Sequence, residues 1–414
     1  MSRPTMQDTP PNAAPSGDGV ELRSPPLAGV RVLDLSRVLA GPWCTQCLAD
    51  LGAEVLKVES PGDGDETRTW APPYAGDMSA YFTCANRSKS SLVVDLKTQE
   101  GKDTILALAA QADVVIENFK TGSLERMGLG REDLRRINPR LIHCSISGYG
   151  RSGPQPDRAG YDFVIQAESG LMSITGEADG PPVKVGVAVS DIITGLYASQ
   201  AILAALVEQR KTGQGRFLDV ALFDCQLAAL ANIQASVLAT GQTPRRFGNA
   251  HATVGPYQVV DAADGPFVIA LGNSRQFDVF CRQLLDRPDI AEDDRFRTNG
   301  DRLTNREALN ALIAPELLKR SSQEWLELFH RHGLPGGLVQ TVDQALASEQ
   351  VSGRGLVHRF NEEIAVVRYP VQVEGGLPDP SPPPHPGEGG EALAQEWLSG
   401  VNGISASVQE MEKG

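Results

Sequence analysis

Asp191 is the residue whose type and position could carry out covalent chemistry. It follows an apolar run at residues 183–190 that predicts a strand, and it precedes an apolar helix predicted for residues 192–207. A carboxylate at a helix N-terminus faces unpaired backbone N–H groups, which keep it ionised and able to attack an electrophile. The alternative is an ordinary N-cap, because aspartate is among the preferred capping residues. Spacing alone leaves both interpretations open.

A second candidate site lies at residues 117–129, after another predicted strand. Asn118, Lys120 and Arg126 stand there at strand and helix ends, where they could hold an anionic ligand. The alternative is a solvated loop followed by a surface helix.

Several other chemistries find little support. The turn at residues 36–42 has one glycine and bulky neighbours, whereas dinucleotide sites use G-x-G-x-x-G. Cys44 and Cys47 lack a second cysteine pair or a histidine at metal spacing, so they are interpreted as small apolar residues. The sequence has no G-x-S-x-G motif of a serine hydrolase, and its dispersed histidines predict no metal site.

Length, composition and net charge limit the classes of protein to which the chain can belong. The 414 residues suffice for two or three domains, and 38 basic against 52 acidic residues give a net charge of −14. That charge opposes binding to nucleic acid or to anionic membranes, so basic contacts to an anionic ligand must be concentrated locally. We find no uninterrupted apolar stretch long enough to span a bilayer and no secretory signal. Six sparse cysteines fit a reducing cytosol, so we expect a cytoplasmic protein.

The elements predict an α/β fold with two domains. Short apolar runs alternate with helical segments through the first half, which indicates a doubly wound α/β domain. A hairpin within residues 257–271, three helices and a late strand at 366–373 indicate a smaller α+β domain. The predicted boundaries are a disordered leader at 1–26, a large domain at 27–225, a linker helix and small domain at 226–350, and a return segment with a tail at 351–414.

An ordered series of windows resembles the class III CoA-transferases, the family of formyl-CoA transferase and the carnitine CoA-transferases. The windows cover nearly the whole chain after the leader, at residues 27–42, 51–59, 115–119, 147–150, 211–215 and 248–257. The resemblance implies that Asp191 attacks a thioester to form an anhydride and then an aspartyl-CoA thioester. It also implies a Rossmann-like large domain, an interlocked homodimer, and CoA esters as substrates with no permanently bound cofactor or metal.

The resemblance also assigns residues to the ligands. The implied contacts of CoA are Val38, Leu39, Ala40, Asn118, Phe119, Arg126, Met127 and Tyr149. Arg87 and Lys89 are predicted to meet the ribose phosphate, although Ser60-Pro61 stands where some transferases have an arginine. Gly248, Asn249 and His251 match a mobile loop that covers the intermediates, with a plain interdomain turn as the alternative.

Three positions bear on the reaction and the substrate. The family also contains 2-methylacyl-CoA racemases, which have a histidine where this chain has Tyr161, a poor proton acceptor at neutral pH. Leu39 stands where formyl-CoA transferase has a glutamine, which disfavours formyl and oxalyl chemistry. The chain looks most like the succinyl-CoA–dicarboxylate transferases, whose second substrate carboxylate needs a cation. Arg37 and then Arg275 are the candidates, with a surface or dimer contact as the alternative; a non-catalytic acyl-CoA binding protein is the remaining reading.

Overall fold

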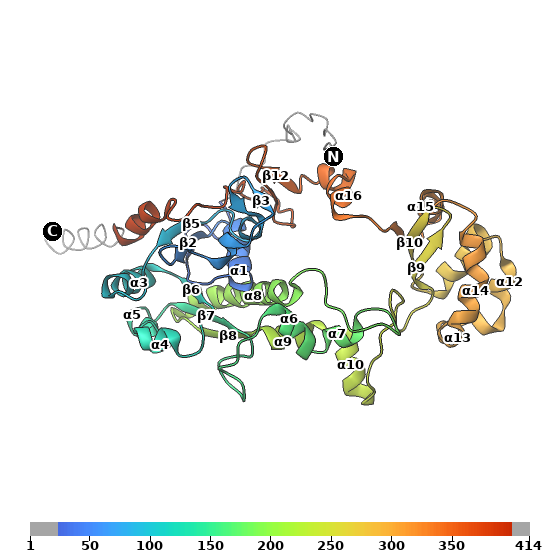
Figure 1. Cartoon of the computed structure of the whole chain (residues 1–414), viewed down its shortest axis with the longest axis horizontal. Helices are drawn as coiled ribbons and strands as arrows, with labels where there is room; N and C mark the ends of the chain where they lie inside the picture. The colour runs from blue at the N-terminus through green and yellow to red at the C-terminus, as the bar shows by residue number, and fades with distance from the viewer. Residues whose placement is uncertain (1–23, 400–414) are drawn as a thin grey trace.

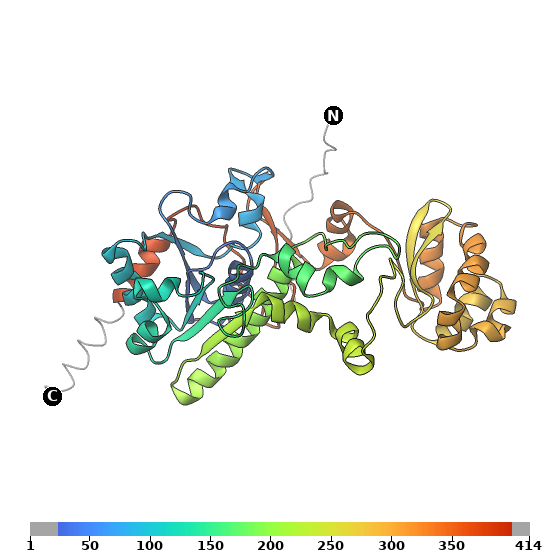
Figure 2. The same cartoon turned by 60° about the horizontal axis from the view of Figure 1, so that its bottom comes forward.

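The computed structural model describes residues 24–399, arranged as two lobes joined by two separate segments of chain (Figure 1). The smaller lobe stands apart at one end of the molecule in both views (Figure 2). Residues 241–256 lead into it and residues 339–356 lead back. The leader predicted at 1–26 lies almost wholly outside the described residues.

The larger lobe is built on a six-stranded parallel sheet in the order β5-β2-β1-β6-β7-β8. Its central strands are buried on both faces, as the continuous Val, Ile and Leu runs predict. The strand order reverses between β1 and β6, and open α/β sheets bind ligands at such a switch point. The strands are β1 (Arg31–Asp34), β2 (Glu54–Glu59), β5 (Ser90–Val93), β6 (Val114–Glu117), β7 (Ile142–Ser147) and β8 (Phe217–Ala221).

Helices cover both faces of this sheet. One apolar cluster joins the sheet to α1 and α8, and another joins it to α3, α5 and the helical residues 390–399. The helices of this lobe are α1 (Ala40–Asp50), η1 (Glu66–Thr69), α2 (Ala80–Thr83), α3 (Gln99–Gln111), α4 (Ser123–Met127), α5 (Arg131–Ile137), α6 (Asp162–Glu168), α7 (Leu171–Ile174), α8 (Val189–Thr212), α9 (Leu222–Ala229) and α10 (Ala231–Thr240).

The smaller lobe has its own core around a three-stranded sheet in the order β11-β10-β9. The hairpin predicted within residues 257–271 is confirmed as antiparallel β9 and β10. A capping box between Ser321 and Glu324 begins the last helix of this lobe. Its elements are β9 (Tyr257–Ala262), β10 (Gly265–Ala270), α11 (Ser274–Val279), the π-helix η2 (Phe280–Leu284), α12 (Pro288–Glu292), η3 (Asp294–Phe296), α13 (Asn299–Thr304), α14 (Arg306–Leu317), α15 (Ser322–Arg331) and β11 (Gly336–Leu338).

After the smaller lobe the chain returns to the larger one. Ile364 packs with Met78 and Phe82, and Trp397 is fully buried and donates a hydrogen bond to Glu54 Oε2 at 2.7 Å. The remaining elements are β3 (Tyr74–Ala75), β4 (Met78–Ser79), α16 (Val342–Leu346), α17 (Glu349–Gly353), β12 (Val357–Arg359) and β13 (Ala365–Val367).

Two predicted strands are wrong. Residues 183–190 form no strand: α8 already begins at Val189, and the N–H groups of Val185 and Ser190 bond to the side chains of Gln166 and Asp162. The strand predicted at 366–373 shrinks to β13, since Pro370 has no N–H to continue a ladder.

Helix α8 is long and apolar, although the sequence analysis found no apolar stretch long enough to span a bilayer. By length and composition α8 is sufficient to cross a membrane, as is the α9–α10 pair if its 80° bend is ignored. Because α8 packs along α1 and the sheet, with Ala198 and Ile202 fully buried, it is explained as a core helix.

Candidate active site

A cavity of about 190 Å³ lies at the switch point of the sheet and contains Asp191 in its wall. Its walls come from the turn after β1, from the segments that follow β6 and β7, and from the start of α8. These segments meet because the carboxyl ends of parallel strands share one edge of the sheet. The residues from those segments that matter below are Arg37, Val38, Leu39, Ala40, Asn118, Phe119, Lys120, Arg151, Arg158 and Tyr161.

Asp191 is the third residue of α8, because the helix begins at Val189 rather than after the aspartate. It is therefore in the first turn and not the N-cap; the cap position is Ala188, which makes no side-chain capping bond. Its backbone position still places the carboxylate at the positive end of a 24-residue helix.

The ionisation of Asp191 differs from the sequence-based expectation. Burial, followed by the nearby negative charge of Asp162, raises the pKa of Asp191 from 3.8 to about 7. No hydrogen bond from the described residues contributes to this shift. Desolvation and like charge therefore outweigh the helix end, and the expectation of a fully ionised group is wrong.

Asp162, the first residue of α6, is joined by a hydrogen bond to the start of α8, where Asp191 lies. Its carboxylate accepts the Ser190 N–H at 2.9 Å and the Gln166 side-chain amide at 2.8 Å. Gln166 is itself fully buried and accepts the Val185 N–H at 2.9 Å. This network fixes the chain that leads into the first turn of α8.

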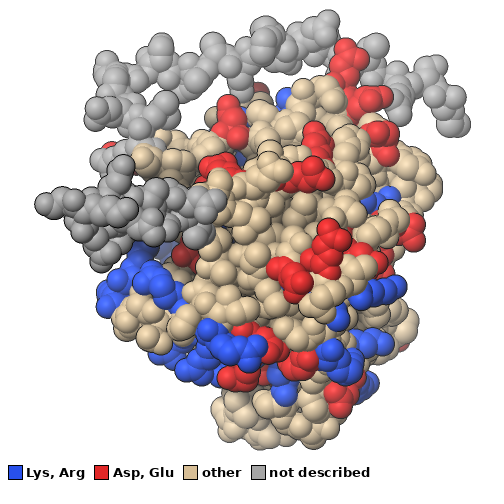
Figure 3. Space-filling view, turned by 90° about the vertical axis from the view of Figure 1, so that its left-hand side faces the viewer, with Lys and Arg blue, Asp and Glu red and all other residues tan. Residues whose placement is uncertain are grey.

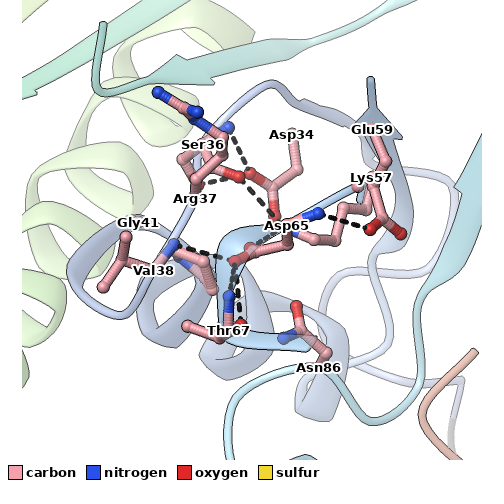
Figure 4. Close-up of polar contacts among 12 residues, drawn as sticks. Asp34, Ser36, Arg37, Val38, Gly41, Lys57, Glu59, Asp65, Thr67 and Asn86 are labelled. Atoms are coloured by element: carbon pink, nitrogen blue, oxygen red, sulfur yellow. Dashed lines mark hydrogen bonds and ion pairs between the residues drawn. The ribbon is translucent and has the colours of Figure 1, made fainter. Parts of the chain in front are cut away.

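The turn after β1 forms another part of the wall, and several of its peptide groups have partners. Arg37 N–H donates to Asn118 Oδ1 at 3.0 Å, and the Asn118 amide donates back to Arg37 O at 2.7 Å. Beneath the turn lie three buried charged residues, Asp34, Lys57 and Asp65, while the Arg37 side chain points away from them (Figure 4). Arg37 is exposed, and its guanidinium lies 5.7 Å from the centre of the Phe119 ring.

The two walls are connected through helix packing. A Cβ added to Gly195 of α8 would lie 2.7 Å from Ala40 O and 3.1 Å from the Trp43 side chain. Only glycine therefore allows α8 to approach the start of α1 this closely. Since Gly195 lies one helical turn after Asp191, this contact sets how far the carboxylate stands from the turn.

The structure brings six predicted ligand residues to the cavity and separates the others from it. In its wall lie Arg37, Val38, Leu39, Ala40, Asn118 and Phe119. Arg126 and Met127 lie on neighbouring α4, where Arg126 is exposed and bonds to Ser123. Tyr149 lies outside the wall, with its hydroxyl donating to Glu168 at 2.7 Å and Arg158 stacked over its ring.

The predicted role of Arg87 and Lys89 as contacts of the ribose phosphate is corrected by the structure. Arg87 is 6% exposed and forms a two-pronged ion pair with Asp50, and Lys89 is 5% exposed and bonds to Asp34 at 3.2 Å. Their charges are already used inside the protein, so neither is placed to meet a ribose phosphate. Burial lowers the pKa of Lys89 to about 8, although Asp34 opposes the shift.

The predicted lid and the second arginine lie far along the chain, outside the cavity wall. Gly248 and Asn249 are exposed in the segment leading to the smaller lobe, and Gly248 has a φ of 58° and donates to Gly176 O. His251 bonds through its backbone to Tyr257 O, and Arg275 is exposed on α11. Their roles as lid and substrate ligands stay predictions.

Sequence reasoning missed three residues near the nucleophile. Arg151 lies in the cavity wall and is held by Glu117, Ser145 and Thr121, and Arg158 lies there paired with Glu168. Tyr81 on α2 has a pKa raised to about 12 by burial and then by the charge of Asp191. Neither arginine stands in a local motif that marks it as a site residue.

Comparison with known proteins identifies the family. The model of CoA-transferase family III matches residues 27–390. The succinate–glutarate CoA-transferase of Agrobacterium fabrum is 46% identical over 340 residues, covering 81% of this chain and 85% of that protein. Succinyl-CoA:glutarate CoA-transferase of Homo sapiens is 46% identical over 332 residues, covering 80% and 76%.

Solved structures agree. A CAIB/BAIF family protein from Brucella suis superposes with a TM-score of 0.81 at 44% identity, covering 91% of this chain and 100% of that one. A hypothetical protein from Mycobacterium tuberculosis gives 0.80 at 33% identity, covering 89% and 99%. The family predicted from the sequence is thereby confirmed. With a carboxylate nucleophile candidate in a cavity at the switch point, the chain belongs to CoA-transferase family III.

Proposed function

We propose that this CoA-transferase moves CoA from succinyl-CoA to a small dicarboxylic acid, with Asp191 as the covalent carrier. The supporting observation is the placement of Asp191. Its carboxylate lies in the wall of the cavity, and no described residue donates a hydrogen bond to its oxygens. A carboxylate committed to capping would be occupied by backbone N–H groups. This one is available to a substrate.

The reaction follows as two exchanges through Asp191. Its ionised Oδ attacks the donor thioester carbonyl, forming a mixed anhydride and releasing CoA thiolate. The thiolate then attacks the aspartyl carbonyl, which frees succinate and leaves an aspartyl-CoA thioester. The acceptor carboxylate attacks this thioester to form a second anhydride, and the returning thiolate takes the acceptor acyl group and restores Asp191. The thioester bond energy is conserved at each step, provided that water is excluded.

The start of α1 suits the oxyanions that form in these steps. Leu39 and Ala40 lie in the cavity wall where α1 begins, and no capping side chain occupies the N-terminal N–H groups of this 11-residue helix. Unpaired N–H groups at a helix start stabilise developing negative charge. Asp191 and the start of α1 therefore offer a nucleophile and an oxyanion site in the wall of one cavity.

The charge distribution supports an anionic ligand. Although the net charge is −14, Lys and Arg side chains gather on the lower part of the face in Figure 3. The α4–α5 region and the residues after it supply exposed arginines: Arg126, Arg131, Arg135, Arg136 and Arg140. We propose that the phosphates of CoA bind along this region, with Arg126 nearest the cavity segments.

Arg37 is our candidate for the second carboxylate of the substrates. It is exposed in the cavity wall, and no ion pair to it is found among residues 24–399, whereas Arg158 is already paired with Glu168. A guanidinium can bind a carboxylate through two parallel hydrogen bonds. Two relatives are named as succinate–glutarate and succinyl-CoA:glutarate CoA-transferases, and glutarate and succinate both carry a second carboxylate.

We also propose a homodimer in the cytoplasm. Helix α10 has no buried residue, and Leu238 on it is 83% exposed. An apolar helix left uncovered in one chain is a surface that a second copy can cover. Among the described residues all six cysteines are free, which supports a reducing compartment.

A panel assay tests the function. Succinyl-CoA is incubated with glutarate, other dicarboxylates and matched monocarboxylates, and CoA exchange is followed by mass spectrometry. We expect exchange with dicarboxylates, and we expect Arg37→Gln to raise KM for them by about tenfold or more while changing KM for monocarboxylates little. Absence of exchange with every acid, or solvent deuterium uptake at the α-carbon of a 2-methylacyl-CoA, contradicts the proposal.

A further inference from the structure

Val38 adopts a backbone conformation that valine disfavours. Its φ is 70°, in the left-handed region, and it is the one β-branched residue among the four non-glycine residues with positive φ that the structure describes. The two branches on Cβ crowd the neighbouring carbonyl in this region, so such residues occupy it only when the surroundings force them. Conformations of this kind cluster at functional sites.

Asp65 accepts the N–H of Val38. The Val38 N–H donates to Asp65 Oδ1 at 3.3 Å, across a sequence separation of 27 residues. Asp65 lies below the turn in Figure 4, with its carboxylate directed toward Val38 and Thr67. The peptide between Arg37 and Val38 is thus held on both sides, its C=O by the Asn118 amide at 2.7 Å and its N–H by Asp65. The bond to Asp65 is the one made by Val38 itself.

The Asp65 carboxylate is itself fixed by several buried donors. Thr67 donates to Oδ1 through its N–H at 3.0 Å and its hydroxyl at 2.8 Å, and Lys57 Nζ donates to Oδ2 at 2.9 Å. Asp65 and Lys57 are both 0% exposed. Burial alone would raise the pKa of Asp65, but Lys57 and the Thr67 donors hold it below its usual value.

Lys57, which binds Asp65, also binds the turn after β1 at a second point. Its Nζ also donates to Ser36 O at 2.9 Å, while Ser36 N–H and hydroxyl donate to Asp34. The peptide groups on both sides of Arg37 are thus tied to buried charges. This turn leads directly into α1, and α1 contacts the helix of Asp191 through Gly195.

We propose that Asp65 is a positioning residue for CoA transfer: it helps to hold Val38 in its left-handed conformation and so positions the turn and the start of α1 in the cavity that contains Asp191. The inference rests on the proposed function, since alignment matters only if Asp191 and the α1 N-terminus act on one acyl group. Asp65 touches no substrate; it acts through Val38.

A double-mutant cycle between Asp65 and Val38 tests the inference. Glycine adopts a φ of 70° without strain, so Val38→Gly removes the need for the Asp65 anchor. We expect Asp65→Asn to lower kcat by about tenfold, equivalent to about 1.4 kcal/mol, with KM for succinyl-CoA nearly unchanged. In the Val38→Gly background the same change should lower kcat by only about two- to threefold. Equal losses in the two backgrounds, or a loss seen only in KM, overturn the proposal.

Thermal unfolding of the same four proteins separates this proposal from the proposed function. If the wild type lacks CoA exchange, the proposed function fails. The hydrogen bond between Asp65 and Val38 still predicts that Asp65→Asn destabilises the wild type more than it destabilises the Val38→Gly variant. If Asp65→Asn does not fold, Thr67→Val replaces it, since this change removes one donor to the same Oδ1. Its loss of kcat should again shrink in the Val38→Gly background, and an unchanged loss contradicts the proposal.

Discussion

Asp191→Asn should make the protein more stable at neutral pH while it abolishes CoA transfer. The pKa of Asp191 rises from 3.8 to about 7 because burial and Asp162 both disfavour the carboxylate. In the folded state the group therefore binds a proton more tightly than in the unfolded chain. Its contribution to stability is fully present below its unfolded pKa and is lost as pH rises through about 7. Asparagine carries no charge and loses nothing over this range.

The magnitude follows from the shift. About three pKa units at about 1.4 kcal/mol each give an upper limit of about 4 kcal/mol. Because Asp191 is only partly buried by surface area, screening by solvent reduces this to about 1–3 kcal/mol at about pH 8. Between about pH 5.5 and 8 the advantage of the variant should grow by about 1 kcal/mol.

Urea unfolding followed by tryptophan fluorescence and circular dichroism measures this difference. Asp157→Asn is the matched control, since Asp157 lies in the same cavity wall but is exposed. The control should show no pH-dependent advantage. An Asp191→Asn advantage that is the same at both pH values, or a variant less stable than wild type at about pH 8, would refute the reasoning.

Three further changes test other parts of the site. Asp162→Asn removes a negative neighbour of the nucleophile, so the acid limb of the kcat/KM profile should move below about pH 7; an unmoved limb contradicts the assigned coupling. Gly195→Ala should lower stability by about 1–3 kcal/mol in thermal or urea unfolding, because its Cβ would lie 2.7 Å from a backbone oxygen of α1, whereas Gly186→Ala meets no atom within 4 Å and should not. Arg87→Ala breaks a buried ion pair and should cost about 3–5 kcal/mol of stability with KM for succinyl-CoA unchanged; a raised KM at full stability would restore Arg87 as a CoA ligand.

Much of the site could be predicted because the motifs are local. Asp191 stands at the start of a long apolar helix, and Arg37 and Asn118 each follow a buried strand, so a parallel sheet brings them to one edge. The hairpin of the smaller lobe follows from a turn between two short apolar runs. The strand ends and helix starts that carry these residues are recognisable from a few neighbouring residues, and the parallel sheet then determines where they meet.

The predictions that failed depend on contacts between residues far apart in the sequence. Arg87 and Lys89 look like free cations in the sequence, and only the fold places Asp50 and Asp34 against them. Residues 183–190 have the alternation of a strand, yet two of their N–H groups bond to the side chains of Gln166 and Asp162 instead of to a neighbouring strand. The raised pKa of Asp191 likewise depends on burial and on Asp162, and neither can be read from a helix N-terminus.

The central claim is that Asp191 itself becomes acylated, and peptide mass spectrometry tests it most directly. The protein is mixed with succinyl-CoA, quenched in acid during turnover and digested. The account predicts a CoA adduct on the peptide that contains Asp191, which hydroxylamine converts to a hydroxamate and which is missing in Asp191→Asn. An adduct on a different residue, or steady CoA exchange with no adduct at all, would contradict it.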